Sequence, residues 1–224
     1  MARTISNLLV NFIHDREFLR AARQHLRGRL LDIGCGEKPY GKMLAPLVVN
    51  HIGVDHPGTL HTHQNIDTYG TAYALPVASN SFDSAISTAV LEHLEEPEAA
   101  LRECFRVLKP GSTAIYTVPF IWHIHEEPRD FYRFSEYGLR YLIRKIGFEE
   151  VSIRALSGFW VTFGQLLVYN LYRLNRGPIR WFHLLDPVGL LMQLVAYLLD
   201  LIDRSERWTW MYIAVARKPA VDGS

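Results

Sequence analysis

Hydrophobic positions in the first part of the chain recur at the spacing of an amphipathic helix. Between residues 5 and 26 the apolar positions fall mostly three or four places apart, at Ile5, Leu8, Leu9, Phe12, Leu19, Ala22 and Leu26. Residues spaced in this way share one side of an α-helix and can be buried together. Gly28 favours a helix end just before it. The pattern therefore predicts an N-terminal helix within residues 1–27.

Short runs of apolar and β-branched residues then alternate with further helical patterns. The predicted strands cover residues 29–33, 51–54, 84–87, 113–118, 148–155 and 210–216. Predicted helices cover residues 97–108 and 135–146, with Pro97 suited to a first turn and Ser135 to an N-cap. The Lys-Pro-Gly sequence at 109–111 is expected to stop the first of these helices. The alternation predicts an α/β, Rossmann-like fold with a mostly parallel sheet and helices on both faces.

Several chemically distinctive stretches follow directly after predicted strands. They are the turn that contains Gly34 and Gly36, then Asp55, and the segments after Ser87 and Val118. In parallel sheets the ligand binds beyond the carboxyl ends of the strands, near the point where the strand order reverses. We therefore expect these stretches to form one site.

A long apolar insert separates the last two predicted strands. A tight hairpin would connect them, yet residues 157–208 intervene. The insert contains two apolar stretches, at 159–172 and 188–202. Small or polar residues form a narrow stripe along each, namely Thr162, Gln165, Tyr169, Arg173 and Arg176 in the first and Gly189, Gln193, Ala196, Asp200 and Asp203 in the second. The spacing predicts two helices with broad apolar faces.

Basic and aromatic residues lie between the two apolar stretches, namely Arg173, Arg176, Arg180, Trp181 and His183. Such residues beside apolar helices are typical of a membrane interface. Each stretch is shorter than the roughly 20 residues that span a bilayer. The alternatives are a re-entrant hairpin, a homodimer interface and an internal core. Because the insert follows a parallel strand, we expect it on the ligand side of the sheet, where it would offer an apolar wall to an isoprenoid, quinone-like or lipid-linked molecule.

The composition restricts the binding partners and the cellular compartment that are expected for this protein. Among 224 residues, 49% are hydrophobic and the net charge is +1, which gives no indication of nucleic-acid binding. The two cysteines, Cys35 and Cys104, fall in a turn and in a helical pattern, so no disulfide and a reducing compartment are expected. No secretory signal is recognised at the N-terminus. We expect a cytoplasmic protein of one domain, with peripheral contact to a membrane as a further possibility.

The sequence LLDIGCGEKPY at residues 30–40 restricts the ligand of the glycine turn. A phosphate-binding P-loop is excluded because Lys38 follows Gly36 too soon and no Ser or Thr comes next. A dinucleotide fingerprint would place a third glycine where this chain has Pro39. S-adenosylmethionine fits better, since its amino-acid end can lie against Gly34 and Gly36. Asp32 could then face its ammonium, and Asp55 could accept hydrogen bonds from both ribose hydroxyls.

An ordered series of motifs strengthens this interpretation. It comprises LLDIGCG, GVD at 53–55, ALPVASNSFDSAISTAVLEHL at 74–94 and LRECFRVLKPG at 101–111. In these motifs the chain resembles the class I S-adenosylmethionine-dependent methyltransferases, in particular the group that includes the ubiquinone and menaquinone C-methyltransferases. The resemblance covers residues 28–156 and the last strand.

The resemblance implies a fold and a set of cofactor contacts. The sheet should have seven strands, the last antiparallel. The expected cofactor-binding residues are Asp32, Gly34, Cys35, Gly36, Asp55, His56, Thr71, Ala72, Leu75, Thr88, Ala89 and Val90. Among them, Ala72 and Leu75 should pack near the adenine. We interpret Cys35 as a small residue that fits the turn, and not as a nucleophile.

Two positions depart from the pattern of the group. Lys38 stands where a third glycine is often found. Thr71 stands where an acidic residue often meets the adenine amino group, and Asp67 is an alternative acidic partner.

The stretch PFIWHIHEEPRDFYRFS, residues 119–135, follows the fifth strand and carries many polar side chains. Its position suggests a role in function. His125 is the first candidate for a general base, because an imidazole titrates near neutrality, and His93 and Tyr132 are alternatives. Glu92 and His93 could also simply begin a helix. Ion pairs of an arginine, Arg129 or Arg133, with Glu126 or Asp130 are the structural alternative for this stretch.

Two pairs of histidines have the spacing of metal ligands on an extended segment, His61 with His63 and His123 with His125. No cysteine or second clear cluster completes either pair, so no metal site is expected.

The sequence thus favours a methyltransferase that uses S-adenosylmethionine on an apolar or lipid-linked small molecule. A methyltransferase for a soluble small molecule or sugar, with the insert as a dimer interface, is one alternative. A non-catalytic binding or scaffold protein is the other. Within one domain, the expected parts are the helix at 1–27, the cofactor-binding core at 28–156, the insert at 157–208 and the last strand at 209–219.

Overall fold

The computed structural model describes residues 4–59, 62–178, 183–203 and 205–220. In chain order its elements are η1 (Ile5–Asn7), α1 (Leu8–His25), β1 (Arg29–Ile33), α2 (Gly41–Leu44), β2 (Asn50–Asp55), η2 (His63–Asn65), β3 (Thr68–Tyr69), β4 (Phe82–Thr88), η3 (Leu91–His93), α3 (Pro97–Val107), β5 (Leu108–Pro119), α4 (Glu136–Ile146), β6 (Glu149–Ala155), α5 (Phe159–Tyr172), α7 (Asp186–Ile202), η4 (Glu206–Trp208) and β7 (Met211–Arg217).

The strands form one sheet in the order β3-β2-β1-β4-β5-β7-β6. β1 pairs in parallel with both β2 and β4, and β4 pairs in parallel with β5. Backbone hydrogen bonds join Gly111 to Lys218 and Phe120 to Trp210, so β7 runs antiparallel to β5. The seven-stranded sheet with an antiparallel last strand is therefore confirmed. The strand order reverses between β1 and β4, where α/β sheets of this kind bind ligands.

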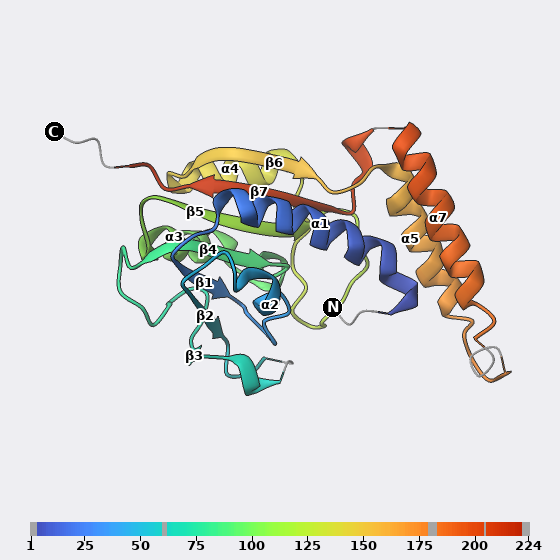
Figure 1. Cartoon of the computed structure of the whole chain (residues 1–224), viewed down its shortest axis with the longest axis horizontal. Helices are drawn as coiled ribbons and strands as arrows, with labels where there is room; N and C mark the ends of the chain where they lie inside the picture. Colours follow the sequence, from blue (N-terminus) through green and yellow to red (C-terminus); the bar gives the residue numbers. More distant parts are fainter. Residues whose placement is uncertain (1–3, 60–61, 179–182, 204, 221–224) are drawn as a thin grey trace. The chain divides into compact units, whose positions relative to one another are not determined.

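Helices cover both faces of this sheet. α3 and α4 contact each other on one face, and the part of α1 from Phe18 onward lies on the opposite face (Figure 1). Ser135 caps α4 by accepting a hydrogen bond from the Gly138 amide at 3.2 Å, as the sequence predicts. The α3 prediction needs a correction, because the helix ends at Val107 and residues 109–111 belong to β5. Leu108 pairs with Phe82 and the ladder resumes only at Thr113, so these residues form an irregularity within the strand.

The chain divides into two compact units. One contains most of the sheet and consists of Phe18–Pro119, Ile124–Arg154 and Tyr212–Ser224. The other consists of Met1–Glu17, Phe120–His123 and Ala155–Met211, so it combines the start of the chain with the insert. The grouping of the N-terminal segment with the insert was not among the sequence predictions, which treated the N-terminal helix as a part of its own.

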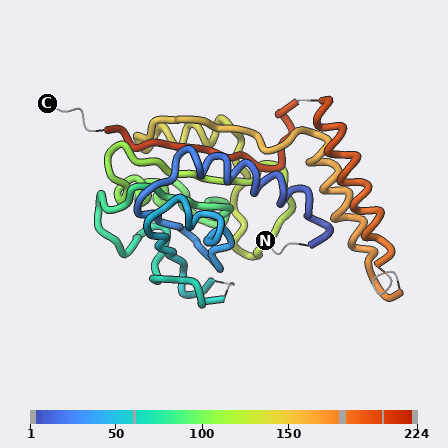
Figure 2. Tube along the Cα trace, viewed as in Figure 1, coloured from blue at the N-terminus to red at the C-terminus, as the bar shows by residue number. Residues whose placement is uncertain are grey.

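The insert contains the two predicted helices. α5 and α7 lie side by side as a hairpin (Figure 2). Gly164 permits this close packing, because a Cβ atom there would lie 2.6 Å from the Cβ of Ala196. Of the polar stripe of α7, Gly189, Gln193 and Ala196 are buried, whereas Asp203 is exposed. Gln193 is 4% exposed and donates to the Ile5 carbonyl at 2.8 Å while it accepts from the Leu9 amide at 2.8 Å.

The apolar side of α7 faces outward. Its exposed side chains are Val188, Leu190, Leu191, Leu194, Val195, Leu198, Leu201 and Ile202. The exposed fractions reach 61% for Leu191 and 82% for Ile202. We call this set the α7 apolar face. Within the described residues, no helix combines the length and the apolarity needed to cross a bilayer.

Candidate active site

The glycine turn after β1 is held against the end of β2. Gly34 and Gly36 have φ values of +70° and +49°, which residues with a Cβ rarely adopt. The amides of Gly34 and Cys35 both donate to the Val54 carbonyl, at 2.9 and 3.1 Å. The Gly36 amide donates to the Oδ2 atom of Asp55 at 2.6 Å. These contacts hold the predicted glycine turn against Asp55, the predicted partner of the ribose.

Asp55 retains capacity for a further ligand. Its Oδ1 atom accepts the His56 amide at 2.7 Å, so each carboxylate oxygen carries one backbone hydrogen bond. A carboxylate offers about four acceptor sites in total. Each oxygen can therefore still accept one hydroxyl, as a ribose requires. The residues present fit S-adenosylmethionine at this point.

The segment after β4 lies against the same turn. A Cβ atom on Gly34 would lie 2.5 Å from the Cγ2 atom of Val90, so only glycine fits there. Ala89 adopts a φ of +53°, and its amide donates to the Thr117 carbonyl at 2.9 Å. The predicted contact segment from Thr88 to Val90 is thus at the carboxyl edge beside the turn. Its contact with the cofactor remains a prediction.

Asp32 has a partner that the sequence analysis missed. It is 3% exposed, and its Oδ2 atom lies 2.9 Å from Nε2 of His51. Burial raises the pKa of Asp32, and the hydrogen bond from His51 opposes that rise. In the register Asp32 lies opposite Gly53, two residues after His51, so both side chains point to one side of the sheet. This strand register was the signal that could have revealed the pair.

Lys38 has a structural role in place of the usual third glycine. It adopts a φ of +49°. Its Nζ atom donates to the His51 carbonyl at 3.0 Å and pairs with Asp67. Asp67 also accepts the Gly53 amide at 2.6 Å. Burial acts to raise the pKa of Asp67, but the Gly53 and Lys38 hydrogen bonds lower it on balance. Asp67 therefore stabilises the turn, and its role toward adenine remains a prediction.

The predicted adenine-side residues follow β3. The Gly70 amide donates to the Asp55 carbonyl at 3.0 Å, which places Thr71 and Ala72 just beyond the Asp55 strand end. Thr71 forms an isolated bridge with Ala74. Leu75 is buried, and its amide donates to Glu103 at 2.9 Å.

Cys35 is buried beside the glycine turn. Burial, with added effects of Asp32 and Asp55, raises the pKa of its thiol to about 12. The thiol is therefore neutral near physiological pH, which agrees with its interpretation as a small turn residue.

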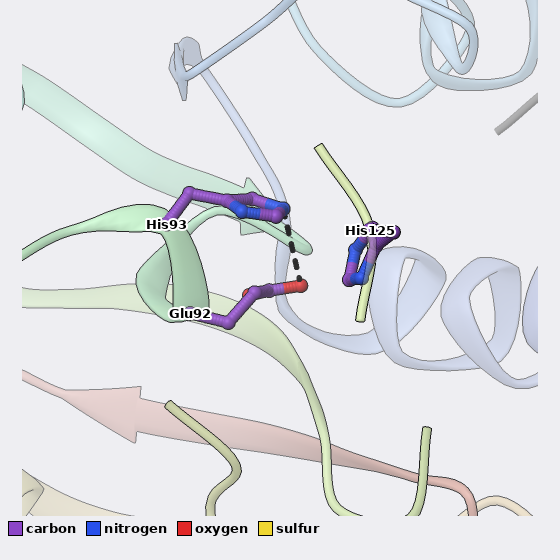
Figure 3. Close-up of side chains that lie close together, drawn as sticks. All are labelled: Glu92, His93 and His125. Atoms are coloured by element: carbon purple, nitrogen blue, oxygen red, sulfur yellow. Dashed lines mark ion pairs between the residues drawn. The ribbon is translucent and has the colours of Figure 1, made fainter. Parts of the chain in front are cut away.

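The polar stretch after β5 meets η3 in a cluster of Glu92, His93 and His125 (Figure 3). An Oε1 atom of Glu92 lies 3.9 Å from Nε2 of His93, and the two imidazole rings have centroids 4.8 Å apart. Glu92 is 0% exposed, and burial raises its pKa to about 8. His93 and His125 were both candidates for the base, but their cluster with a buried carboxyl group was not predicted from the sequence.

Neighbouring residues orient the two histidines. Nδ1 of His93 lies 2.5 Å from the Arg129 carbonyl. Asp130 accepts the His125 amide at 2.8 Å, and its Oδ2 atom lies 3.3 Å from Nδ1 of the same residue. Arg133 donates to both oxygens of Asp130, at 2.6 and 2.7 Å, and these bonds hold the pKa of Asp130 well below its usual range. The ion pair of Arg133 with Asp130, one of the structural alternatives for this stretch, is thus present. Through Asp130 it also orients His125.

The remaining candidates are engaged elsewhere. The Tyr132 hydroxyl donates to the Glu95 carbonyl at 2.9 Å. His123 belongs to the other unit and packs against Trp122 and Tyr169. His61 lies outside the described residues, so its pairing with His63 is not described.

Comparisons with known proteins agree with this geometry. Residues 31–116 match the family model described as a methyltransferase domain. A protein of Mycobacteroides abscessus named as an uncharacterized methyltransferase is 37% identical over 115 residues, 44% of this chain and 44% of that protein. A ubiquinone biosynthesis O-methyltransferase of Pseudomonas fluorescens is 24% identical over 82% of this chain and 81% of its own. The chain spans less than half the length of the mycobacterial relatives that it matches.

Solved structures show the same fold. A S-adenosylmethionine-dependent methyltransferase from Archaeoglobus fulgidus superposes with a TM-score of 0.59 at 15% identity, over 96% of this chain and 95% of that one. Phosphoethanolamine N-methyltransferase 2 of Haemonchus contortus, solved with S-adenosylmethionine, gives 0.58 at 17% identity over 94% and 56%. Residues 31–116 thus carry a methyltransferase domain, and the sheet around them has the fold of the class I S-adenosylmethionine-dependent methyltransferases.

Proposed function

We propose that the protein transfers a methyl group from S-adenosylmethionine to an apolar or lipid-linked small molecule. Bound S-adenosylmethionine would supply an electrophilic methyl group on its sulfonium. The observation that supports cofactor binding is the Asp55 carboxylate, fixed 2.6 Å from the Gly36 amide with free acceptor capacity. The Gly34–Gly36 turn, Asp55 and the Thr88–Val90 segment would hold the cofactor.

The α7 apolar face supports the class of acceptor. Its leucines remain exposed although Gly189, Gln193 and Ala196 of the polar stripe on the same helix are buried. Exposed apolar surface of this kind marks contact with lipid, an apolar ligand or another protein. Relatives named as ubiquinone biosynthesis O-methyltransferases favour the first two, because a quinone precursor is itself apolar.

In this proposal, a side chain in or beside the cluster of Glu92, His93 and His125 removes the acceptor's proton. Methyl transfer to a hydroxyl or an enolisable carbon is helped by a base near the reacting atom. His125 is our first choice, since Asp130 orients its ring and its side chain is 19% exposed. His93 and Tyr132 are the alternatives, although the Tyr132 hydroxyl is already bonded to Glu95.

A transfer assay tests the function. The protein is incubated with S-adenosylmethionine labelled in its methyl group, together with either a total lipid extract or an aqueous metabolite extract. We expect label in the lipid fraction. Label in the aqueous fraction alone would favour the soluble-acceptor alternative. Cofactor binding by calorimetry without transfer to either fraction would favour a non-catalytic protein.

A further inference from the structure

Glu92 is a buried carboxyl group whose contact with His93, 3.9 Å from its Oε1 atom, is too long for a hydrogen bond. Its side chain is 1% exposed, and neither of its oxygens accepts a hydrogen bond from another residue in the described part of the chain. A buried carboxylate is costly unless it is paired or coordinates a metal. The protein nevertheless places this group at the carboxyl edge of the sheet, on η3, and not within the apolar core. That position calls for a physical reason.

Two imidazoles approach the same point. One potential ligand atom from each of Glu92, His93 and His125 lies within 4.8 Å of the other two. For a tetrahedral zinc ion with bonds of about 2.0–2.1 Å, ligand atoms stand about 3.4 Å apart. Small side-chain rotations would close the difference, and Figure 3 shows all three side chains directed toward one another. The histidine side chains are 14% and 19% exposed, which leaves a path for an ion.

The surroundings have the form of an outer shell around metal ligands. Metal-bound histidines usually donate their second ring N–H to a carbonyl or a carboxylate. His93 has the Arg129 carbonyl 2.5 Å from Nδ1, and His125 has Asp130 3.3 Å from Nδ1. For His93 this arrangement directs Nε2 toward two carboxylates, Oε1 of Glu92 at 3.9 Å and Oε2 of Glu126 at 3.7 Å. Asp130 is in turn fixed by Arg133, so the outer shell is itself anchored.

We propose that Glu92, His93 and His125 bind one divalent transition-metal ion of the zinc type. Two imidazoles and one carboxylate suit Zn²⁺ or Fe²⁺, whereas Mg²⁺ prefers oxygen ligands alone. Three protein ligands also leave one position open, as in catalytic zinc sites. The ion would balance the charge of Glu92 and link η3 to the stretch after β5.

This site goes beyond the proposed function and does not depend on it. An ion held by both imidazoles would replace His125 as the base named above, because neither histidine could then accept a proton, and the ion would lower the pKa of a bound acceptor hydroxyl instead. The function and the metal site can therefore be tested separately.

The test uses the metal alone. Full-length protein treated with a chelator is titrated with ZnCl₂ or MgCl₂, without cofactor or acceptor, and followed by calorimetry and thermal unfolding. We expect one zinc ion per chain, no comparable binding of magnesium, and a rise in Tm of about 5–10 °C at a hundredfold excess over Kd. Co²⁺ should give the visible absorption of a low-coordinate site with nitrogen ligands.

Single substitutions test which side chains bind the metal ion. Glu92→Gln preserves shape, and His125→Asn removes one imidazole. Each should weaken zinc binding by more than the roughly 10- to 100-fold that the loss of an outer-shell partner costs. His63→Ala is the matched control, because His63 lies outside the cluster, and it should bind zinc as the wild type does. The proposal is overturned if wild-type protein shows no zinc binding and no cobalt spectrum. It is equally overturned if folded Glu92→Gln and His125→Asn proteins bind zinc like the His63→Ala control.

Discussion

At the scale of single residues, Asp55 connects the glycine turn to the predicted cofactor. Asp55→Ala should weaken S-adenosylmethionine binding, because one hydrogen bond from a ribose hydroxyl to a charged carboxylate contributes about 1.5–3 kcal/mol. The expected loss is roughly ten- to hundredfold in Kd, measured by calorimetry.

Asp83 supplies the matched control for this change. It also accepts a backbone amide, from Arg29 at 2.8 Å, but it lies at the amino end of β4. Asp83→Ala should leave Kd unchanged. If folded Asp55→Ala protein binds the cofactor as tightly as the wild type, the ribose assignment is wrong.

His125 should matter for turnover and not for cofactor binding. His125→Ala removes the side chain that Asp130 orients, so the transfer rate should fall by about a hundredfold or more at an unchanged cofactor Kd. Single-turnover kinetics with labelled cofactor provide the measurement. A rate within about twofold of the wild type would leave the polar stretch with a structural role only.

Glu92 should make stability depend on pH. Its pKa is raised by burial from the ordinary 4.5 to about 8. Between these values the folded protein keeps a proton that the unfolded chain has released. The free energy of unfolding should therefore fall as pH rises through this window, by up to about 1.4 kcal/mol per pH unit.

Glu92→Gln should remove that contribution. Urea unfolding in the presence of a chelator, at intervals from about pH 5 to pH 8, should show the variant gaining stability relative to the wild type as pH rises. Parallel stability curves for the two proteins would contradict the raised pKa.

Single residues also show where sequence reasoning reached its limit. Asp32, Asp55 and the two glycines were identified because their spacing carries the chemistry. The partner of Asp32 was not, because His51 becomes a neighbour only through strand register. Glu92 was left between a functional and a helix-starting role, because its burial depends on side chains from a distant segment.

Among the elements, the insert helix α7 buries Gly189, Gln193 and Ala196 of its polar stripe and exposes its apolar side. Gln193 anchors the stripe through Ile5 and Leu9. Gln193→Leu would remove both hydrogen bonds and leave the Leu9 amide without its side-chain acceptor, so it should lower the free energy of unfolding by about 1–3 kcal/mol. Gln24→Leu, at an exposed position of α1, is the control and should have little effect. Equal stability of the two variants would mean that the stripe does not hold the N-terminal segment.

The α7 apolar face should bind lipid. The double variant Leu191→Glu and Leu198→Glu changes side chains that are 61% and 50% exposed, so folding should survive. Binding to phosphatidylcholine vesicles should fall by at least about tenfold, since each buried leucine contributes about 1.5–3 kcal/mol. Neutral vesicles exclude simple charge repulsion as the cause.

Val49→Glu, at a position that is 87% exposed, controls for added charge. It should leave vesicle binding as it is. Loss of folding in the double variant would indicate a core helix, and conversion of a dimer to a monomer with vesicle binding intact would indicate a subunit interface.

Strands and helices with strong periodicity were predicted close to their observed bounds, as β1 and α4 show. The short elements α2 and β3 were missed, and η3 was only one of two alternatives for Glu92 and His93. Each has fewer than five residues, too few for a periodic pattern, and depends on tertiary contacts. The start of β5 was also missed, because Pro110 and Gly111 ordinarily punctuate a chain, whereas here they form an irregular strand end.

At the largest scale, the chain combines a methyltransferase domain with a second compact unit, which is formed mainly by the N-terminal residues and the insert. The domain was predictable because its motifs occur in a fixed order along the sequence. The association of the insert with the N-terminal residues was not, because it depends on Gln165 and Gln193 bonding to backbone atoms far away in the sequence.

We propose, above all, that this domain methylates an acceptor held in or near a lipid surface. The most direct measurement compares transfer rates for a long-chain quinone-like phenol in vesicles and its short-chain soluble analogue, in wild-type protein and in the Leu191→Glu, Leu198→Glu variant. We predict that the variant loses activity by about tenfold or more on the membrane-held phenol and keeps it on the soluble one. Equal rates of the two proteins on the membrane-held phenol, or a wild type active only on the soluble analogue, would contradict the claim.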